Sequence, residues 1–221
     1  MTKTLILGAS GGIGAALAAA CAARGEDVVG LSRSVDRFDI TDENSVSDHL
    51  GRLDGPFERV VVATGALEIN GAEPEKSIKA ISRQAMMDQF ALNAVGPALV
   101  LAHAHRLLPR KGRSVMAVLS ARVGSIGDNR MGGWISYRSA KAAVNQVVHT
   151  AAIELARTHK ENVLVALHPG TVETPFTQKY LGRHPAVPAD EAAENLLRVM
   201  DGLAPENAGG FYDWAGKEVA W

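Results

Sequence analysis

Two residues of the sequence, Tyr137 and Lys141, are spaced to carry out proton transfer. They stand four positions apart in a segment that is expected to be helical, so their side chains share one face of the helix. An ammonium group beside a phenol favours the phenolate, so we expect Lys141 to lower the pKa of Tyr137 from its usual value of about 10. Such a tyrosine can give a proton to a carbonyl oxygen during reduction, or take one from an alcohol during oxidation.

A glycine-rich turn near the start of the chain is suited to holding a phosphate. Gly8, Gly12 and Gly14 lie between a short apolar run and an alanine-rich helix, and Ser10 and Ile13 belong to the same turn. Glycines let backbone N–H groups approach a pyrophosphate, and a helix N-terminus favours an anion. The spacing is G-x-x-x-G-x-G, not the more common G-x-G-x-x-G, so a plain tight connection is the alternative. Together, the turn and the tyrosine–lysine pair predict hydride transfer with a nicotinamide cofactor.

The residues after the second predicted strand indicate which cofactor is used. An acidic residue there would accept a hydrogen bond from the ribose 2′-OH of NAD, but the chain has Leu31-Ser32-Arg33. Arg33 is suited to pair with a 2′-phosphate, and Ser32 to donate a hydrogen bond to it. The sequence therefore favours NADP(H) over NAD(H). The alternative is that Arg33 is a solvated loop cation.

The elements that must position these residues alternate along the chain. Short apolar runs predict strands, and longer segments with Ser, Thr or Gly at their ends predict helices. We expect strands at 4–7, 27–32, 38–40, 59–63, 114–119, 162–167 and 209–214, and helices at 13–24, 42–53 (N-cap Thr41), 77–108 (broken near Gly96-Pro97), 136–159, 174–181 and 189–202. This order is typical of the α/β class, as a single-domain Rossmann fold: a doubly wound parallel sheet with helices on both faces.

Composition limits the classes of protein to which the chain can belong. Its 221 residues, 47% of them hydrophobic, suffice for one domain over residues 1–221. The net charge of −1 argues against a nucleic-acid partner. Cys21 is the only cysteine, which excludes an intrachain disulfide and favours a reducing compartment. The start has no signal-peptide pattern, and the apolar stretch 91–108 contains a proline, two histidines and an arginine, so we expect a cytoplasmic protein with no membrane span.

We expect no metal site. His103 and His105 stand two positions apart and face different sides of a helix.

Four ordered motifs resemble those of the short-chain dehydrogenase/reductase family over nearly the whole chain. They are Gly8-x-x-x-Gly12-Ile13-Gly14, Asn93-Ala94-Val95-Gly96, Tyr137-x-x-x-Lys141 and Pro169-Gly170-x-x-x-Thr174. The segments 122–129, 132–138 and 211–221 are similar to the sniffer/C-factor subgroup of that family.

The resemblance implies a role for each matching residue. Tyr137 would be the general acid/base, Lys141 would tune it and bind the nicotinamide ribose, and Asn93 would hold a water in a proton relay. Asn93 also reads as a helix-kink residue that bonds local backbone. The resemblance further implies cofactor contacts: Asp39 and Ile40 beside the adenine, Ala63 and Gly65 along the central strand, Pro169 and Gly170 near the nicotinamide, and Val172 and Thr174 at the carboxamide or phosphates.

The chain departs from the family pattern in three places. Ala121 occupies the position of the usual serine that binds the substrate oxygen. Ser125 is the more plausible substitute, because strand alternation turns Ser120 to the opposite face unless a bulge intervenes; with neither in reach, activity should be weak. Val62-Ala63-Thr64-Gly65 replaces Asn-Asn-Ala-Gly. The gap from Ser32 to Phe38 is too short for one crossover helix.

These observations leave two functions open. The first is an NADP(H)-dependent reductase of a small carbonyl or alcohol. The second is a dinucleotide-binding signalling or regulatory protein with little turnover, which Ala121 and the signalling associations of the subgroup favour. We also expect a homodimer or homotetramer packed through the helices at 77–108 and 136–159, and a lid over the substrate at 178–188. Trp134 is either a packing residue or part of the substrate wall.

Overall fold

Six parallel strands form the central sheet of the chain, in the order β2-β1-β3-β4-β5-β8. The computed structural model describes residues 1–174, 177–180 and 186–221. Its strands are β1 (Lys3–Leu7), β2 (Asp27–Leu31), β3 (Arg59–Val62), β4 (Ser114–Leu119), β5 (Asn162–His168) and β8 (Phe211–Asp213), with β6 (Val172–Glu173) and β7 (Val187–Pro188) paired separately.

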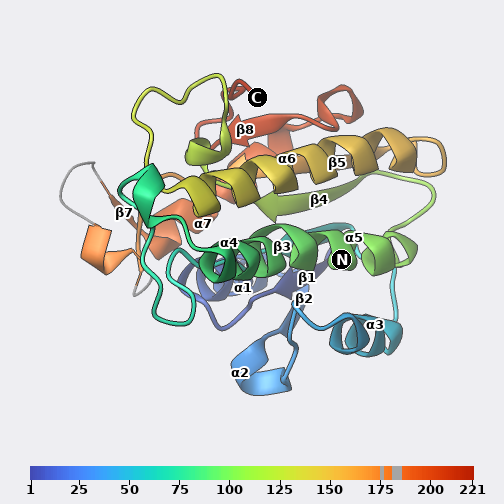
Figure 1. Cartoon of the computed structure of the whole chain (residues 1–221). Helices are drawn as coiled ribbons and strands as arrows, with labels where there is room; N and C mark the ends of the chain where they lie inside the picture. The colour runs from blue at the N-terminus through green and yellow to red at the C-terminus, as the bar shows by residue number, and fades with distance from the viewer. Residues whose placement is uncertain (175–176, 181–185) are drawn as a thin grey trace.

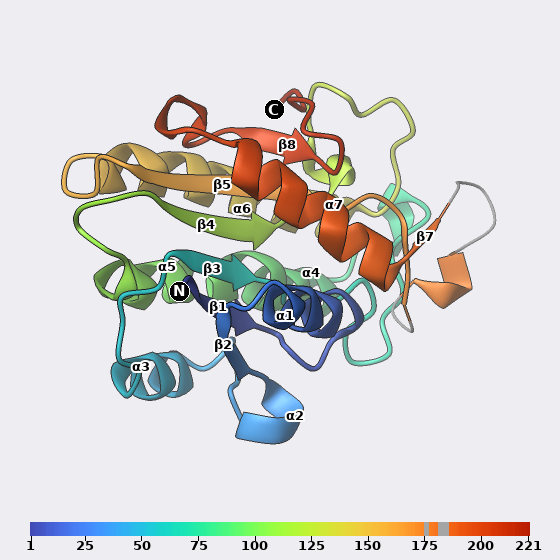
Figure 2. The ribbon, with the colours of Figure 1, turned by 180° about the vertical axis from the view of Figure 1, so that it is seen from behind.

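Helices cover both faces of this sheet (Figures 1 and 2). One face is covered by α1 and α7, whose Leu17, Cys21, Leu196 and Leu197 share one core cluster. The other is covered by α3, α5 and α6, which share a second cluster. The predicted fold class is therefore confirmed. The helices are α1 (Gly12–Ala23), α2 (Arg33–Asp36), α3 (Glu43–Gly51), α4 (Arg83–Phe90), α5 (Gly96–Ala104), α6 (Ile135–Leu155) and α7 (Ala189–Gly202), with the short or irregular turns η1 (Ile78–Ala80), η2 (Ala91–Val95), η3 (His105–Leu107), η4 (Arg122–Gly124), η5 (Gln178–Tyr180) and η6 (Pro205–Asn207).

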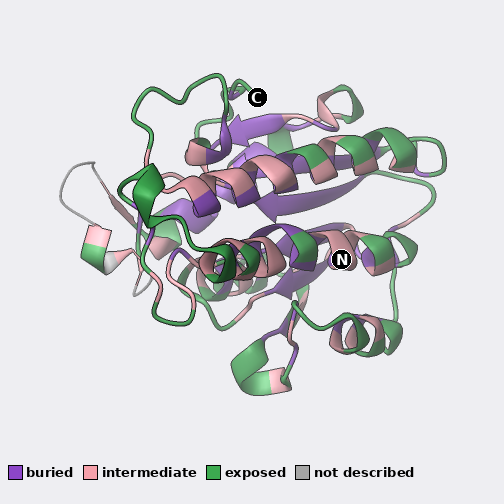
Figure 3. Ribbon diagram, viewed as in Figure 1, coloured by how far each residue is buried: buried purple, intermediate pink, exposed green. Residues whose placement is uncertain are grey.

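The central strands are buried from end to end (Figure 3). Val60 and Val62 of β3 enter one core cluster and Val61 enters the other, as the alternation of a strand requires. A parallel sheet that is covered on both faces gives continuous apolar runs of this kind. Because the strands are parallel, the loops that follow them all meet at one edge of the sheet, where α/β proteins bind ligands.

The segment after β2 differs from the prediction. Residues 38–40 are not a strand, because Phe38 and Ile40 pack into the core and the N–H of Phe38 closes a turn onto the carbonyl of Ser32. The short gap holds only the one-turn helix α2, and β2 is left as the edge of the sheet. Thr41 is not the N-cap of the next helix. Asp42 caps α3 by accepting from Asn44, while Thr41 bonds to Asp39.

The long helix predicted for 77–108 begins later than expected. Ser77 caps the turn η1, and Ser82 caps α4. The break that was predicted near Gly96-Pro97 is the π-helical segment η2. This segment ends just before these two residues, and α5 continues from it. By length and hydropathy alone, residues Arg83–Leu107 would be long enough to cross a membrane. In the fold this helix packs against α6 and α3, and a core helix meets the same criteria.

Candidate active site

The glycine turn after β1 is packed too closely for side chains. A Cβ at Gly14 would lie 2.1 Å from the carbonyl oxygen of Gly8, and Gly8 has a φ of +94°. A Cβ at Gly12 would lie 2.6 Å from Cγ2 of Thr174. The turn therefore brings together the first and last motifs that the sequence assigned to the cofactor. Gly11 precedes α1 and provides no capping side chain, so the first N–H groups of α1 are suited to bind a phosphate.

Of the two side chains that were expected to bind a 2′-phosphate, Ser32 is hydrogen-bonded within the protein and Arg33 is exposed. Ser32 is buried, and its hydroxyl accepts from Val35 and donates to Asp36 as the N-cap of α2. Arg33 is exposed and forms no ion pair within the described part of the chain. Ser34, which the sequence analysis did not single out, bonds through its hydroxyl to that of Ser10 at 2.9 Å. This contact joins α2 to the glycine turn. Because the two serines stand 24 residues apart, no local sequence pattern indicates it.

The two residues expected beside the adenine have different surroundings. The carboxylate of Asp39 accepts from the N–H and the hydroxyl of Thr41, at 2.9 and 2.7 Å. These hydrogen bonds hold the pKa of Asp39 below its usual value. The side chain of Ile40 is buried and lies against Gly96, where a Cβ would be 3.0 Å from it. Asp39 is thus the polar group at this position, and Ile40 is a packing residue.

Asn93 joins the end of β3 to α6. It lies in η2, and π-helical segments of this kind are frequent at functional sites. Its amide accepts from the N–H of Ala66 and donates to the carbonyl of Ala66. A Cβ at Gly65 would lie 2.9 Å from Oδ1 of Asn93 and 3.5 Å from Nζ of Lys141. The neighbouring Ala63 lies against Gly8, so the ends of β1 and β3 meet here.

Gln89 is a further buried residue of this network. It accepts from Asn93 at 2.7 Å and donates to the carbonyl of Leu67 at 2.8 Å. Its position four residues before Asn93 on a predicted helix was a usable signal that the sequence analysis passed over.

Tyr137 and Lys141 lie together on the buried face of α6, as their spacing predicts. Nζ of Lys141 is 5.8 Å from the centre of the Tyr137 ring and donates to the carbonyl of Leu119 at 3.0 Å. A Cβ at Gly124 would lie 2.8 Å from the backbone of Lys141, so η4 rests directly on this turn of the helix. The two side chains are 8% and 3% exposed, and the desolvation that follows decides their protonation.

The expected direction of the Tyr137 pKa is wrong for the structure as described. Burial raises the pKa of Tyr137 above its usual value, and burial lowers the pKa of Lys141 to about 8. Desolvation opposes the charged form of each group, and it is the cause of both shifts here. Tyr137 is therefore protonated at neutral pH, which is the state that donates a proton.

The serines that were weighed as substitutes for Ala121 are both buried and engaged. Ser120 donates to the side chain of Asn145 at 2.6 Å, and Ser125 accepts from the N–H of Asp128 at 3.0 Å. Neither forms a hydrogen bond to Tyr137 or Lys141 within the described residues.

The loop after β5 carries the remaining motif. Gly170 has a φ of +83°, and a Cβ there would lie 3.0 Å from the indole of Trp214. This packing of the C-terminal segment on the Pro169-Gly170 turn was not predicted. Val172 is buried in β6, and the N–H of Thr174 donates to the hydroxyl of Thr177. Among the described residues, no group of three His, Cys, Asp or Glu side chains converges on a metal position.

Two aromatic residues form a row with Tyr137. The ring of Trp134 lies edge-on to Tyr137 and to Tyr180, with centre distances of 6.4 and 5.6 Å. Of the predicted lid, residues 178–180 form the turn η5, and 181–185 lie outside the described residues. Lys179 in this turn pairs with Glu73 at 2.5 Å and with Glu68 at 3.3 Å.

Comparisons with known proteins find similar sequences and similar folds. A family profile described as short chain dehydrogenase matches residues 2–183. A 1-hydroxy-2-glutathionyl-2-methyl-3-butene dehydrogenase of Rhodococcus sp. (strain AD45) is 31% identical, over 100% of both chains. The C-signal protein of Myxococcus xanthus is 36% identical over 62% of this chain and 78% of its own. A short-chain dehydrogenase/reductase structure from Burkholderia multivorans with bound NADP superposes with a TM-score of 0.85 at 28% identity, covering 100% of this chain and 99% of its own.

Proposed function

Because the chain belongs to the short-chain dehydrogenase/reductase family, we propose that it is an NADP(H)-dependent enzyme that reduces a small carbonyl compound or oxidises the corresponding alcohol. Membership of the family makes the chain an oxidoreductase. The assignment of Tyr137 as general acid/base, the choice of cofactor and the kind of substrate are our proposals. We also propose that residues 1–221 form one dinucleotide-binding domain that functions in the cytoplasm.

The observation that carries this proposal is the pairing of Tyr137 with Lys141 beside Asn93. The phenol and the ammonium are buried on one face of α6, and Gly65 separates Lys141 from the amide of Asn93. A buried pair of ionisable groups with shifted pKa values is typical of a catalytic site. Three elements of the fold, β3, η2 and α6, converge to place it.

The residues of the chain then divide the chemistry among them. A bound nicotinamide cofactor would be held by the glycine turn, Pro169-Gly170 and Thr174, and it would supply or take the hydride. Tyr137 would donate its proton to the carbonyl oxygen as hydride arrives at the carbon. Lys141 would stabilise the phenolate that results and bind the ribose hydroxyls. Asn93 would hold a water that returns the proton through Lys141.

The preference for NADP(H) is supported by Arg33. Arg33 is exposed, and the next residue, Ser34, bonds to Ser10 of the glycine turn, whereas Ser32 is engaged within α2. Arg33 is therefore the main candidate to pair with a 2′-phosphate. The Burkholderia multivorans structure holds NADP, and a carbonyl reductase from chicken fatty liver holds NADPH.

An assembly of two or four chains remains our proposal for the quaternary structure. Met87, Val95 and Ile153 on the helices α4 to α6 are about half exposed, and they would be covered if these helices packed against a second copy. Sedimentation should show a dimer or tetramer at micromolar concentration. A monomer alone would contradict this part of the proposal.

A second candidate function is favoured by Ala121. Ala121 has no hydroxyl, and Ser120 gives its hydrogen to Asn145. Ser125, which accepts from Asp128, keeps its O–H free, but within the described residues it makes no hydrogen bond to the Tyr137–Lys141 pair. Losing one donor to the substrate oxygen costs about 2.7–4 kcal/mol in transition-state stabilisation. The alternative is therefore a dinucleotide-binding signalling or regulatory protein with little turnover.

The two functions are separated by an absorbance assay. The pure protein and its Tyr137→Phe variant are mixed with NADPH, and separately with NADH, and with a panel of small aldehydes and ketones. We expect NADPH loss with the wild type and about 100-fold less with Tyr137→Phe. Equal loss in both proteins, or none in either despite tight NADPH binding, would favour binding without catalysis.

A further inference from the structure

The catalytic helix α6 begins without a capping side chain of its own. Trp134 precedes its first residue, has left-handed backbone angles (φ 53°, ψ 37°) and makes no side-chain cap hydrogen bond. Helices usually start with an extended Ser, Thr, Asp or Asn whose oxygen accepts from an early N–H. A bulky residue with positive φ is an outlier that its surroundings must hold in place. The start of α6 therefore depends on contacts from outside the helix.

Glu75 supplies these contacts from a loop 61 residues away. Its carboxylate accepts from the backbone N–H of Ser136 at 3.2 Å and from the hydroxyl of the same residue. Its backbone oxygen accepts from the N–H of Trp134 at 2.5 Å. No Lys or Arg nitrogen of the described residues lies within 4 Å of this buried carboxylate. The partners of this carboxylate are thus the N–H and the hydroxyl of Ser136, at the positive end of α6.

The capped turn carries the proposed proton donor, Tyr137. Tyr137 follows Ser136 directly, and Glu75 and Tyr137 line the same cavity of about 10 Å³, which is about the least space that one water needs. Trp134 lies against Tyr137 and Tyr180, and the hydroxyl of Tyr180 donates to Glu68 of the same loop at 2.6 Å. The loop that contains Glu68 and Glu75 is therefore hydrogen-bonded to two members of this aromatic row, Trp134 and Tyr180.

We propose that Glu75 is a positioning residue of the reaction. It caps the first turn of α6 from outside, and so keeps the Tyr137 hydroxyl and the Trp134 indole in fixed places while substrate binds. The inference rests on the proposed function, because it acts through Tyr137. In this role Glu75 acts through the helix and takes no part in the transfer of proton or hydride.

The test compares Glu75→Ala and Glu75→Gln with Glu73→Ala, which removes an exposed carboxylate of the same loop that pairs with Lys179. Turnover is measured with NADPH and with NADPH deuterated at both positions of carbon four. We expect Glu75→Ala to lower kcat about 10- to 100-fold, because a small misplacement of a catalytic group has effects of this size. NADPH affinity should stay within about twofold, and the isotope effect should rise as hydride transfer becomes slower. Glu75→Gln keeps an acceptor for the N–H of Ser136 and should recover most of the rate.

Three results would overturn the inference: a kcat for Glu75→Ala equal to that of Glu73→Ala, a loss of NADPH affinity that matches the loss of kcat, or no recovery in Glu75→Gln. Thermal melting checks that each variant is folded. If Glu75→Ala does not fold, Ser136→Ala, which removes only the hydroxyl, takes its place with the same expected direction and a smaller effect. Tyr137→Phe is measured in parallel. A wild-type rate in that variant contradicts the proposed function, whereas an inactive Tyr137→Phe beside a fully active Glu75→Ala contradicts only the role of Glu75.

Discussion

Replacing Lys141 by methionine should stabilise the protein near neutral pH while it removes the activity. Lys141 is buried, its hydrogen bond is to the Leu119 carbonyl, and no carboxylate lies within 4 Å of it in the described part of the chain. A buried ammonium without a counter-ion destabilises the folded state. Methionine has a similar length and no charge, so the substitution removes this cost together with the group that would stabilise the Tyr137 phenolate.

The magnitude follows from the pKa of Lys141. Burial lowers that pKa from 10.5 to about 8, so the unfolded state binds more protons than the folded state between these values. The free energy of unfolding therefore rises with pH across this window, and the full cost, about 3 kcal/mol, is present below about pH 8. From about pH 7 to about pH 9.5 the wild type should gain about 2 kcal/mol relative to Lys141→Met. At about pH 7 the variant should be more stable by about 1–2 kcal/mol, because loss of the hydrogen bond to Leu119 offsets part of the gain.

The assay is urea unfolding of the cofactor-free wild type and variant at both pH values. Comparing the two proteins cancels the contribution of Cys21, whose pKa burial raises to about 11 and which lowers stability as pH rises above about 9. Parallel pH dependence in the two proteins, or a variant less stable than the wild type at about pH 7, would refute the reasoning.

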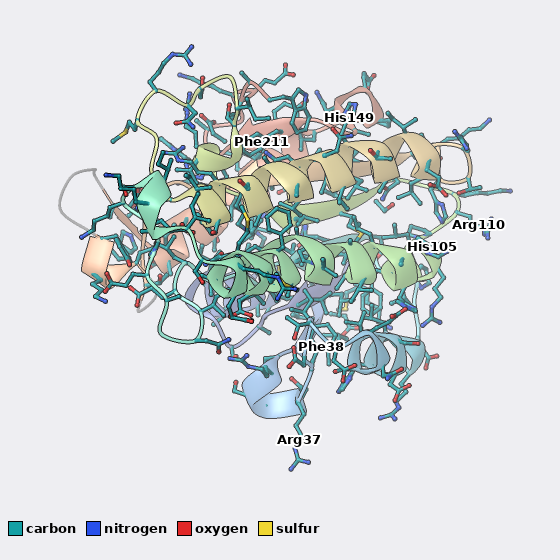
Figure 4. The ribbon with its side chains drawn as sticks, viewed as in Figure 1. Arg37, Phe38, His105, Arg110, His149 and Phe211 are labelled. Carbon is teal, nitrogen blue, oxygen red and sulfur yellow. The ribbon has the colours of Figure 1, made fainter. Side chains whose placement is uncertain are left out.

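Two further predictions concern the cofactor. Arg33→Ala should weaken NADPH binding about 10- to 100-fold and leave NADH binding unchanged, because a charge-assisted pair with the 2′-phosphate is lost. The control is Arg37→Ala, because Arg37 belongs to the same turn and points away from the protein (Figure 4). An equal loss of affinity for both cofactors in Arg33→Ala would count against the assignment. Gly12→Ala should lower the affinity for either cofactor at least about tenfold, because its Cβ would lie 2.6 Å from Cγ2 of Thr174. The control is Gly11→Ala, whose Cβ would lie 3.4 Å from the nearest atom, and this variant should bind both cofactors normally. Titration of cofactor fluorescence measures both, and unchanged binding in Gly12→Ala would contradict the second.

The sheet and its helices were predictable because their signals are local. Each central strand is an apolar run, and the buried stripe of α6 follows the helical repeat, so the placement of Tyr137 beside Lys141 needed only a spacing of four. The glycine turn was predictable for the same reason, since strand, glycines and helix are consecutive. The prediction of a strand at residues 38–40 was wrong because apolar residues that fill a core beside a turn look the same in sequence as a very short strand.

The contacts that were missed join distant parts of the chain. The hydrogen bonds of Glu75 to Ser136 and the packing of Trp214 on Gly170 bring together residues whose separation hides any pattern. The direction of the Tyr137 pKa was missed because spacing reveals the neighbouring ammonium but not the depth of burial, and desolvation is the cause of the shift. The engagement of Ser120 by Asn145 likewise depends on how α6 is packed on β4.

Deuterium transfer in a single turnover tests the central claim most directly. Wild type and Tyr137→Phe, each saturated with NADPH that carries deuterium at both positions of carbon four, are mixed with an aldehyde that the wild type reduces, and the alcohol is analysed by mass spectrometry. We expect deuterium on the former carbonyl carbon in the wild type, formed at least about 100-fold more slowly in Tyr137→Phe at unchanged NADPH affinity. Alcohol without deuterium, or equal rates in the two proteins, would contradict the assignment of Tyr137 as the proton donor in hydride transfer.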